Sequence, residues 1–124
     1  MDIISMDKEF NKVNLLTSDR YLRALDAVLR DSSEYAIFSR EEWKTCLTCD
    51  NGKWKVAFVE RGQDVCPKYF DDVIGACLYL IENVSPKKKT KKIKELYIDK
   101  VGTEPAVINS ESKYIGALKR MAIF

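Results

Sequence analysis

The first part of the chain carries the period of an amphipathic helix. Apolar positions recur every three or four residues behind Thr17 or Ser18, and either of these two can cap a helix by accepting a free backbone N–H. The apolar positions are Leu22, Leu25, Val28 and Leu29, and the polar positions largely opposite them are Arg20, Arg23, Asp26 and Arg30. This pattern predicts a helix that ends at residues 31–33.

The middle of the chain changes to the two-residue period of strands. Residues 35–39 predict a short strand, and Asn51-Gly52 predicts a two-residue turn between two longer strands, because this pair tolerates positive φ. The turn fixes the register, in which Asp50 opposes Lys53 and the next pairs outward are Cys49–Trp54, Leu47–Val56, Thr45–Phe58 and Trp43–Glu60.

Alternation then sorts the side chains of this hairpin onto two faces. The apolar face, which is predicted to look into the core, holds Trp43, Thr45, Leu47, Cys49, Trp54, Val56 and Phe58. The opposite face is half polar and suits solvent or a partner; it holds Lys44, Cys46, Thr48, Lys55, Ala57 and Val59.

Further elements follow Gly62. A turn through Gln63 and Asp64 leads to a strand over residues 65–70, which Pro67 assigns to a sheet edge because proline cannot donate to a strand ladder. Asp71 or Asp72 then caps a helix. Its inward stripe is Ile74, Cys77, Leu78 and Ile81, broadened by Val73, Leu80 and Val84.

The C-terminal third reads as helical. Residues 85–94 predict a linker that runs into a helix with Ile93, Leu96, Tyr97 and Val101 on one side, broken at residues 102–107. A last helix is expected from Asn109 or Ser110. The whole pattern predicts one α+β domain over residues 1–124, with an antiparallel three- to four-stranded sheet packed by helices.

The composition limits which partners and which compartment we expect for this protein. The chain has 124 residues, of which 46% are hydrophobic and 32% charged, and its formal charge is +2. No strong field therefore favours nucleic acid or membrane as the partner. The N-terminus lacks the pattern of a signal peptide, and the apolar run at 73–81 is about half a membrane span. We expect a cytoplasmic protein of unassigned oligomeric state, without a membrane partner.

The chain contains no histidine. Nucleophile systems that pair serine or cysteine with histidine are therefore excluded. Chemistry by Glu60 and Arg61 is the remaining enzymatic alternative, and it requires a pocket with a perturbed carboxylate. We expect a binding protein without catalytic residues or a cofactor.

A C-x-x-C pair, Cys46 and Cys49, could form half of a zinc site. The predicted hairpin places these two thiols on opposite faces, where they cannot bind one ion. The other cysteines, Cys66 and Cys77, stand alone in the sequence. We therefore expect no metal site, and far less than one equivalent of zinc in the purified protein.

The basic run at residues 86–92 reads as a solvated linker and first helical turn, or else as an anchor for phosphate backbones. It lacks the aromatic residues that stack on bases. We expect short RNA or DNA to bind only weakly and to lose most affinity at moderate salt. A small nucleic-acid-associated accessory protein acting through residues 86–94 is the alternative function.

One stretch is similar to a known group of proteins. Residues 51–62 read Asn-Gly-Lys-Trp-Lys-Val-Ala-Phe-Val-Glu-Arg-Gly, and Tyr69-Phe70-Asp71 and a helix with Ala76-Cys77 follow. This pattern, from Cys49 to Val84, resembles small bacterial immunity proteins encoded beside polymorphic or contact-dependent growth-inhibition toxins. The resemblance implies a cytosolic protein that binds and neutralises one toxin domain, without chemistry of its own.

The Glu-Arg-Gly corner provides the candidate partner-binding residues, although the resemblance does not mark them as contacts. They are polar residues beside a rigid element, and their carboxylates could mimic a phosphate-rich substrate. The set is Glu60, Arg61, Asp64, Asp71 and Asp72. The alternative is a structural corner in which Arg61 pairs with one of the three aspartates. The C-terminal half is an equally open choice for the recognition surface.

Overall fold

The computed structural model describes residues 18–30, 32–50, 52–103 and 114. A helix over residues 18–29 comes first. The elements after it are β1 (Tyr35–Ile37), β2 (Thr45–Asp50), β3 (Lys53–Glu60), β4 (Gln63–Phe70), α2 (Val73–Val84) and α3 (Thr90–Thr103). The α+β class, the initial helix and the helical C-terminal part are confirmed. The predicted cap at Thr17 and the predicted helix from Asn109 or Ser110 lie outside the described residues.

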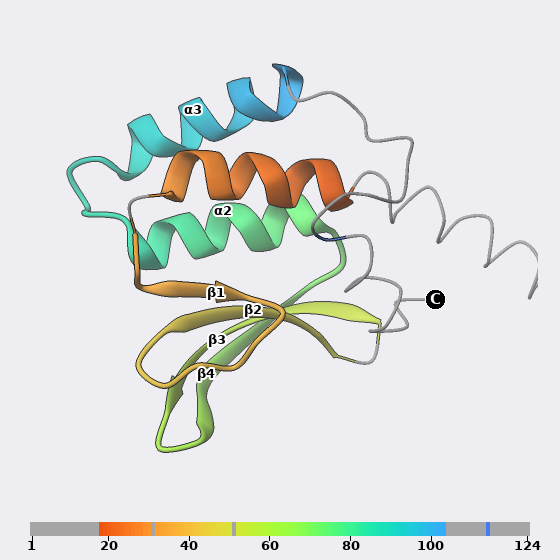
Figure 1. Cartoon of the computed structure of the whole chain (residues 1–124), viewed down its shortest axis with the longest axis vertical. Helices are drawn as coiled ribbons and strands as arrows, with labels where there is room; N and C mark the ends of the chain where they lie inside the picture. The colour runs from red at the N-terminus through yellow and green to blue at the C-terminus, as the bar shows by residue number, and fades with distance from the viewer. Residues whose placement is uncertain (1–17, 31, 51, 104–113, 115–124) are drawn as a thin grey trace, which may run out of the picture.

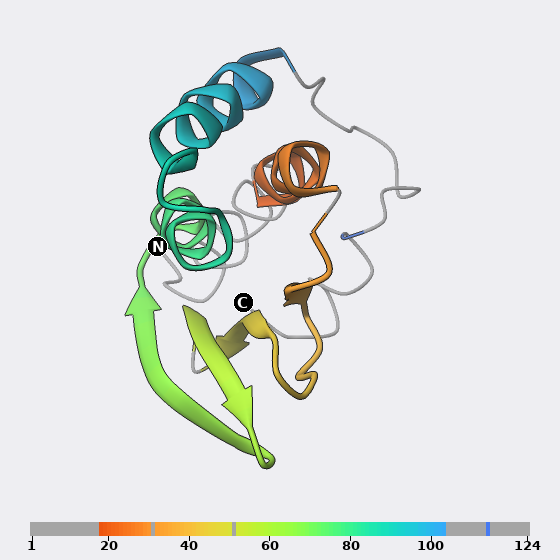
Figure 2. The same ribbon diagram turned by 90° about the vertical axis from the view of Figure 1, so that its left-hand side faces the viewer.

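The strands form one layer, the helix at residues 18–29 and α2 cover it, and α3 packs on these helices away from the sheet (Figures 1 and 2). The strands make one sheet in the order β1-β2-β3-β4, and the three helices lie on the same side of it (Figures 1 and 2). We call the sheet face towards the helices the inner face and the other the outer face. The hairpin of β3 and β4 is the longest part of the sheet, and its turn lies away from the helices (Figure 2).

The predicted register of the central hairpin is confirmed. Asp50 pairs with Lys53 and Cys49 with Trp54, and the pairs continue through Leu47–Val56 to Thr45–Phe58. Gly52 has a φ of 78°, the positive value that the predicted turn requires. The register follows from this turn, because a two-residue loop leaves one way to pair the flanking strands.

The sheet is mixed rather than purely antiparallel, because β1 and β2 run parallel. Parallel neighbours usually need a crossover of about a dozen or more residues. Here the connection is only residues 38–44, and it bends sharply where Phe38 and Trp43 adopt positive φ angles of 62° and 63°. A pattern of apolar positions cannot show this direction, since it is the same for both strand orientations.

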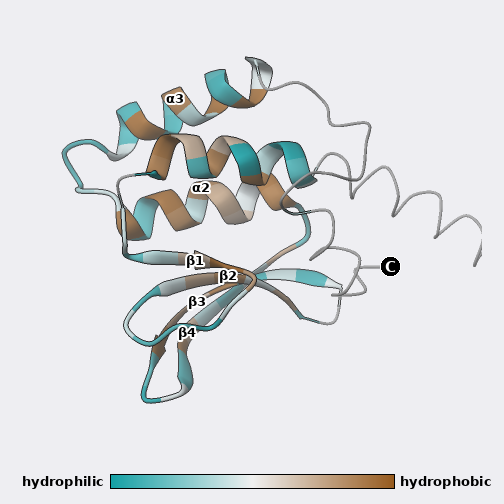
Figure 3. Ribbon diagram, in the orientation of Figure 1, coloured by the Kyte–Doolittle hydropathy of each residue, from teal (hydrophilic) through white to brown (hydrophobic). Residues whose placement is uncertain are grey.

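The main core lies between the inner face and the helices. Its buried side chains come from every layer: Leu22, Leu25 and Leu29, then Leu47, Trp54 and Val56, then Ala76, Cys77, Leu80 and Ile81, with Tyr97 from α3. Figure 3 shows the corresponding hydrophobic stretches in α2 and in the strands. The predicted apolar stripes of these elements therefore meet in one core, where area removed from water stabilises the fold by about 25 cal/mol per Å².

The polar side of the helix at residues 18–29 forms hydrogen bonds and an ion pair that its sequence does not predict. Asp19 is fully buried and its carboxylate pairs with Arg23 at 2.9 Å. The Arg20 Nε donates to the Val101 carbonyl of α3 at 2.8 Å. Asp26 accepts hydrogen bonds from the hydroxyls of Tyr35 and Tyr114, and burial raises the pKa of both tyrosines. These bonds fasten the helix to α3, to β1 and to Tyr114.

The edge position of the strand containing Pro67 is confirmed, since β4 is the last strand of the sheet. The turn that we predicted at Gln63 and Asp64, before this strand, is wrong. Gln63 and Asp64 already belong to β4, and the turn is Arg61-Gly62, with φ values of 53° and 75°. Two positive φ angles in a two-residue loop match the twist of a hairpin, so the chain has already turned at Arg61-Gly62 and the strand begins at Gln63.

The helix predicted after residue 70 is α2, and its cap is Asp72, whose carboxylate accepts the Gly75 N–H at 2.8 Å. Ile74 and Leu78 of its predicted stripe are only half buried, whereas Val73, Leu80 and Val84 are buried. On α3, Tyr97 is fully buried as predicted, but Leu96 is 49% exposed. The burial of α3 thus depends on Tyr97 more than on a broad apolar stripe.

Candidate functional site

Three sets of contacts, which we call clamps, hold the connection between β1 and β2. The first joins it to the C-terminal end of β3. The Trp43 N–H donates to the Val59 carbonyl at 2.7 Å, and the Val59 N–H donates to the Lys44 carbonyl at 3.0 Å. These two bonds extend the pairing of β2 with β3 to the two residues before the start of β2. They hold Trp43 at its positive φ, a conformation that costs a bulky residue roughly 1–3 kcal/mol.

A second clamp is formed by Glu42. Its carboxylate accepts the backbone N–H groups of Arg61, at 2.8 Å, and of Gly62. Successive N–H groups in a turn of positive φ converge on one point and bind an anion well. The turn between β3 and β4 therefore binds a carboxylate from the neighbouring connection, and this joins the two loops.

A third clamp is an ion-pair network on the outer face. Arg40 donates from Nε to the Asp64 carboxylate at 3.0 Å and from Nη2 to the Gly62 carbonyl at 2.7 Å. Lys55 Nζ lies 2.7 Å from the other Asp64 oxygen. The hydrogen bond from Lys55 holds the pKa of Asp64 below its ordinary value, and the same bond raises the pKa of Lys55.

The outer face beneath this connection is closed, which corrects its prediction as a surface for solvent or a partner. Cys46 and Val59 are buried there with Ala36 of β1. The Cys46 Sγ accepts the Glu41 N–H at 3.4 Å, and burial raises the pKa of this thiol. The connection thus covers this part of the outer face and removes the small side chains of Ala36, Cys46 and Val59 from water.

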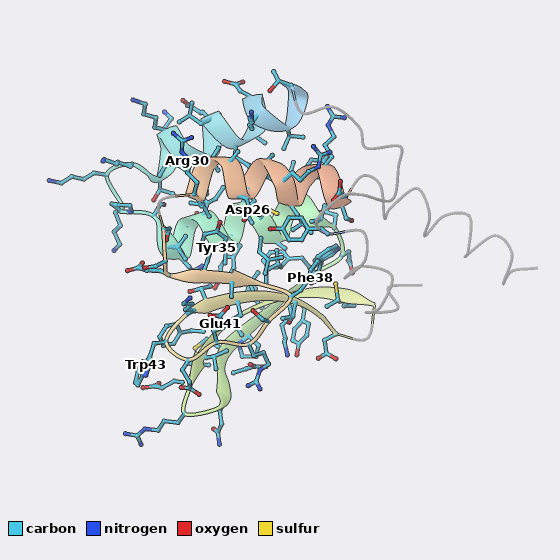
Figure 4. The ribbon with its side chains drawn as sticks, in the orientation of Figure 1. Asp26, Arg30, Tyr35, Phe38, Glu41 and Trp43 are labelled. Carbon is cyan, nitrogen blue, oxygen red and sulfur yellow. The ribbon has the colours of Figure 1, made fainter. Side chains whose placement is uncertain are left out.

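Trp43 is not a core residue, contrary to its predicted place on the apolar face. Its side chain is 61% exposed, and Glu60, its predicted partner, pairs with Gln63. The polar run Arg40-Glu41-Glu42 and the positive φ of Trp43 end the strand pairing before this residue. Figure 4 places Trp43 beside the β3–β4 hairpin and far from the helices.

The indole packs against the inner face of the hairpin where the helices no longer cover it. Its ring lies edge-on to Phe58, with 6.2 Å between ring centroids. Phe58 pairs with Val65 of β4, which is 36% exposed. We call these three residues, together with Glu60 and Arg61 at the adjoining turn, the hairpin surface.

The hairpin surface continues into a shallow pocket of about 100 Å³ against α2. Phe58, Val65, Tyr79 and Asn83 are among the residues that line it. An apolar patch beside a small pocket can receive a side chain from another protein. Such a patch provides shape complementarity for binding.

The structure divides the five predicted partner-binding residues into two groups. Glu60, Arg61 and Asp64 lie at the β3–β4 turn, whereas Asp71 and Asp72 follow the opposite end of β4. Asp71 pairs with Lys53 at 3.0 Å and Asp72 caps α2. The suggested pairing of Arg61 with an aspartate does not occur among the ion pairs of the described residues, where Asp64 pairs with Lys55 and Arg40.

Three residues of this region were missed by sequence reasoning: Arg40, Glu42 and Trp43. The signal that could have found them is the charged run before Thr45, which is too polar to continue a strand. What it could not indicate is the bond from Glu42 to the turn at residues 61–62. That contact joins segments far apart in sequence.

The cysteines do not converge. Pairing of Cys46 with Ala57 and of Cys49 with Trp54 places the two thiols on opposite faces of the sheet. Within the described residues, no group of three or more His, Cys, Asp or Glu side chains is arranged to hold a metal ion. Burial raises the pKa of Cys49 and of Cys77 to about 12.

Comparison with known proteins gives no relative. No protein-family model matches the chain, and neither a curated protein nor a solved structure is significantly similar to it. Among the described residues, no helix combines the length and apolarity that are needed to cross a membrane.

Proposed function

We propose that this protein is a cytoplasmic immunity protein, which binds one cognate bacterial toxin domain stoichiometrically and neutralises it without catalysis. The support comes from two sources. The motif from Cys49 to Val84 resembles such proteins, and its Glu-Arg-Gly ending lies in the hairpin surface. The same motif spans β3, the β3–β4 turn, β4 and α2, and it contains every residue of this surface except Trp43.

The observation that carries the proposal is the exposure of Trp43 on a connection that is clamped three times. Tryptophan and arginine are enriched among the few residues that dominate binding energy at protein interfaces. A side chain that is already held in place loses little conformational freedom on binding. Trp43 is the most exposed large apolar residue of the described chain and packs against Phe58.

The five candidate residues take different roles in this proposal. Glu60 and Arg61 are rim charges that steer the encounter with the toxin domain. Asp64 supports the surface through Arg40 and Lys55. Asp71 and Asp72 hold the start of α2 and contribute to binding only through the fold.

Binding through the free edge of β4 is the less favourable mode. A bulge interrupts the pairing between Val56 and Phe58, Cys66 has a positive φ of 48°, and Pro67 lacks an N–H. Bulges and prolines are devices that protect edge strands against pairing with another chain. The proposed interface therefore uses side chains of the hairpin surface rather than added strand pairing.

The experiment is capture with the tagged full-length chain from its native host, followed by mass spectrometry and by nucleic-acid staining of the eluate. We expect one stoichiometric partner, encoded next to this chain or forming the C-terminal end of a large secreted protein. Expression of that partner domain should arrest growth, and coexpression of this chain should restore it. Growth arrest that this chain does not relieve would contradict the proposal.

A further inference from the structure

A concentrated positive charge lies at the connection between α2 and α3, on the helical layer and apart from the hairpin surface. We call it the basic corner, and its residues are Lys87, Lys88, Lys89, Lys91 and Lys92. All five side chains are exposed. Figure 3 shows this connection as a hydrophilic segment between the two helices.

The basic corner comprises the connection between α2 and α3 and the first turn of α3, as the sequence predicted, and hydrogen bonds hold this connection. The Ser85 hydroxyl donates to the Ile81 carbonyl at 2.6 Å and lies 2.8 Å from the Thr90 hydroxyl. The Pro86 carbonyl accepts the Lys89 N–H at 2.8 Å and the Thr90 hydroxyl at 3.1 Å. The lysine backbones are therefore held in a fixed arrangement on the surface.

The charges of the basic corner are not balanced locally. In the described part of the chain, the ion pair nearest to it joins Lys94 to Glu82, and no ion pair includes the five lysines themselves. The first turn of α3 contains no acidic residue. The free protein therefore carries an unfavourable concentration of charge here.

The rest of the chain has a net charge of the opposite sign. Residues 86–94 contain six of the 21 basic residues and none of the 19 acidic ones, which leaves 15 basic against 19 acidic residues elsewhere. The formal charge is thus +6 for this segment and −4 for the rest. Such an asymmetric distribution orients a protein in the field of a polyanion, with the positive segment foremost.

We propose that the basic corner binds the phosphate backbone of nucleic acid without reading its sequence. Lysine ammonium groups neutralise phosphates and release counterions, which supplies most of non-specific binding. No aromatic side chain lies within residues 85–92 to stack on a base. A membrane surface fits less well, because stable attachment needs a second signal beside a basic patch and this corner has no large apolar side chain to insert.

The test is fluorescence anisotropy with a labelled single-stranded RNA of mixed sequence, titrated with the full-length protein at several salt concentrations. For the wild type we expect log K to fall with log salt with a slope of about −2 to −3.5. Neutralising Lys87, Lys88 and Lys89 together with glutamine should weaken binding at low salt at least about tenfold and reduce the slope by about 2.

A matched variant controls for net charge. Replacement of Lys44, Lys53 and Lys68 by glutamine removes the same charge from the sheet and the connection before β2. It should leave the slope unchanged, with circular dichroism confirming that both variants are folded. The proposal is overturned if the wild type does not bind the RNA at low salt, or if the two triple variants lose affinity equally. Binding only to phosphatidylserine vesicles, and not to RNA, would also overturn it.

Discussion

Individual side chains decide how the connection at residues 38–44 is held. Glu42 binds backbone groups of the β3–β4 turn, and Arg40 reaches the same turn through Asp64 and Gly62. Both side chains are partly exposed, so each bond contributes modestly. Together they hold a tryptophan in a strained backbone conformation, and such strain is typical of functional positions.

Glu42→Ala tests the clamp at this scale. The N–H groups of Arg61 and Gly62 lose their acceptor, and water replaces it at this exposed site. We expect the free energy of unfolding to fall by about 1 kcal/mol, measured by urea denaturation. Glu95→Ala, at an exposed position of α3, is the control and should leave the stability within about 0.5 kcal/mol. Equal effects of the two substitutions would show that Glu42 does not hold the turn.

The ion pairs of Asp64 predict a pH dependence. Its pKa is lower in the folded protein than the ordinary value of 3.8, so its contribution to stability is present above pH 3.8 and disappears as the pH falls through the folded pKa. The stability difference between wild type and Asp64→Asn, up to about 1 kcal/mol near neutral pH, should therefore vanish once the pH falls below the folded pKa of Asp64. A difference that persists in acid would exclude the carboxylate as its cause.

At the scale of elements, the strands and helices could be predicted wherever a turn residue or the spacing of apolar positions determined them. Asn51-Gly52 set the register of β2 and β3, and Pro67 placed β4 at the edge. The parallel pairing of β1 could not be inferred, because it depends on the contacts of residues 38–44 with β3. The same contacts expose Trp43, which alternation alone assigned to the core.

Thiol labelling tests the placement of the strands. Cys66 is exposed at the bulge of β4, whereas Cys46 and Cys77 are buried and Cys49 packs against the core. Burial also raises the pKa of the last three thiols, which lowers the fraction of reactive thiolate. In the native protein we expect Cys66 to react with a maleimide first, and all four thiols to react in denaturant. Fast labelling of Cys46 and Cys49 together, with Cys66 protected, would contradict the sheet.

At the scale of the molecule, the sheet and the helices present two different surfaces. The sheet carries the hairpin surface, which combines an exposed indole with a shallow pocket. The helical layer carries the basic corner. The sequence had located Glu60 and Arg61 but not the aromatic residue beside them, because the candidate site is completed by a connection that precedes it in the chain.

The most direct test of the central claim compares two exposed apolar residues. Tagged wild type, Trp43→Ala and Leu96→Ala are titrated against the toxin domain that the capture experiment identifies. Trp43 is 61% exposed on the hairpin surface, and Leu96 is 49% exposed on α3. We predict that Trp43→Ala weakens binding by at least about 2 kcal/mol, which is roughly thirtyfold, while Leu96→Ala changes it little. Unchanged binding by Trp43→Ala, or a larger loss with Leu96→Ala, would contradict the account.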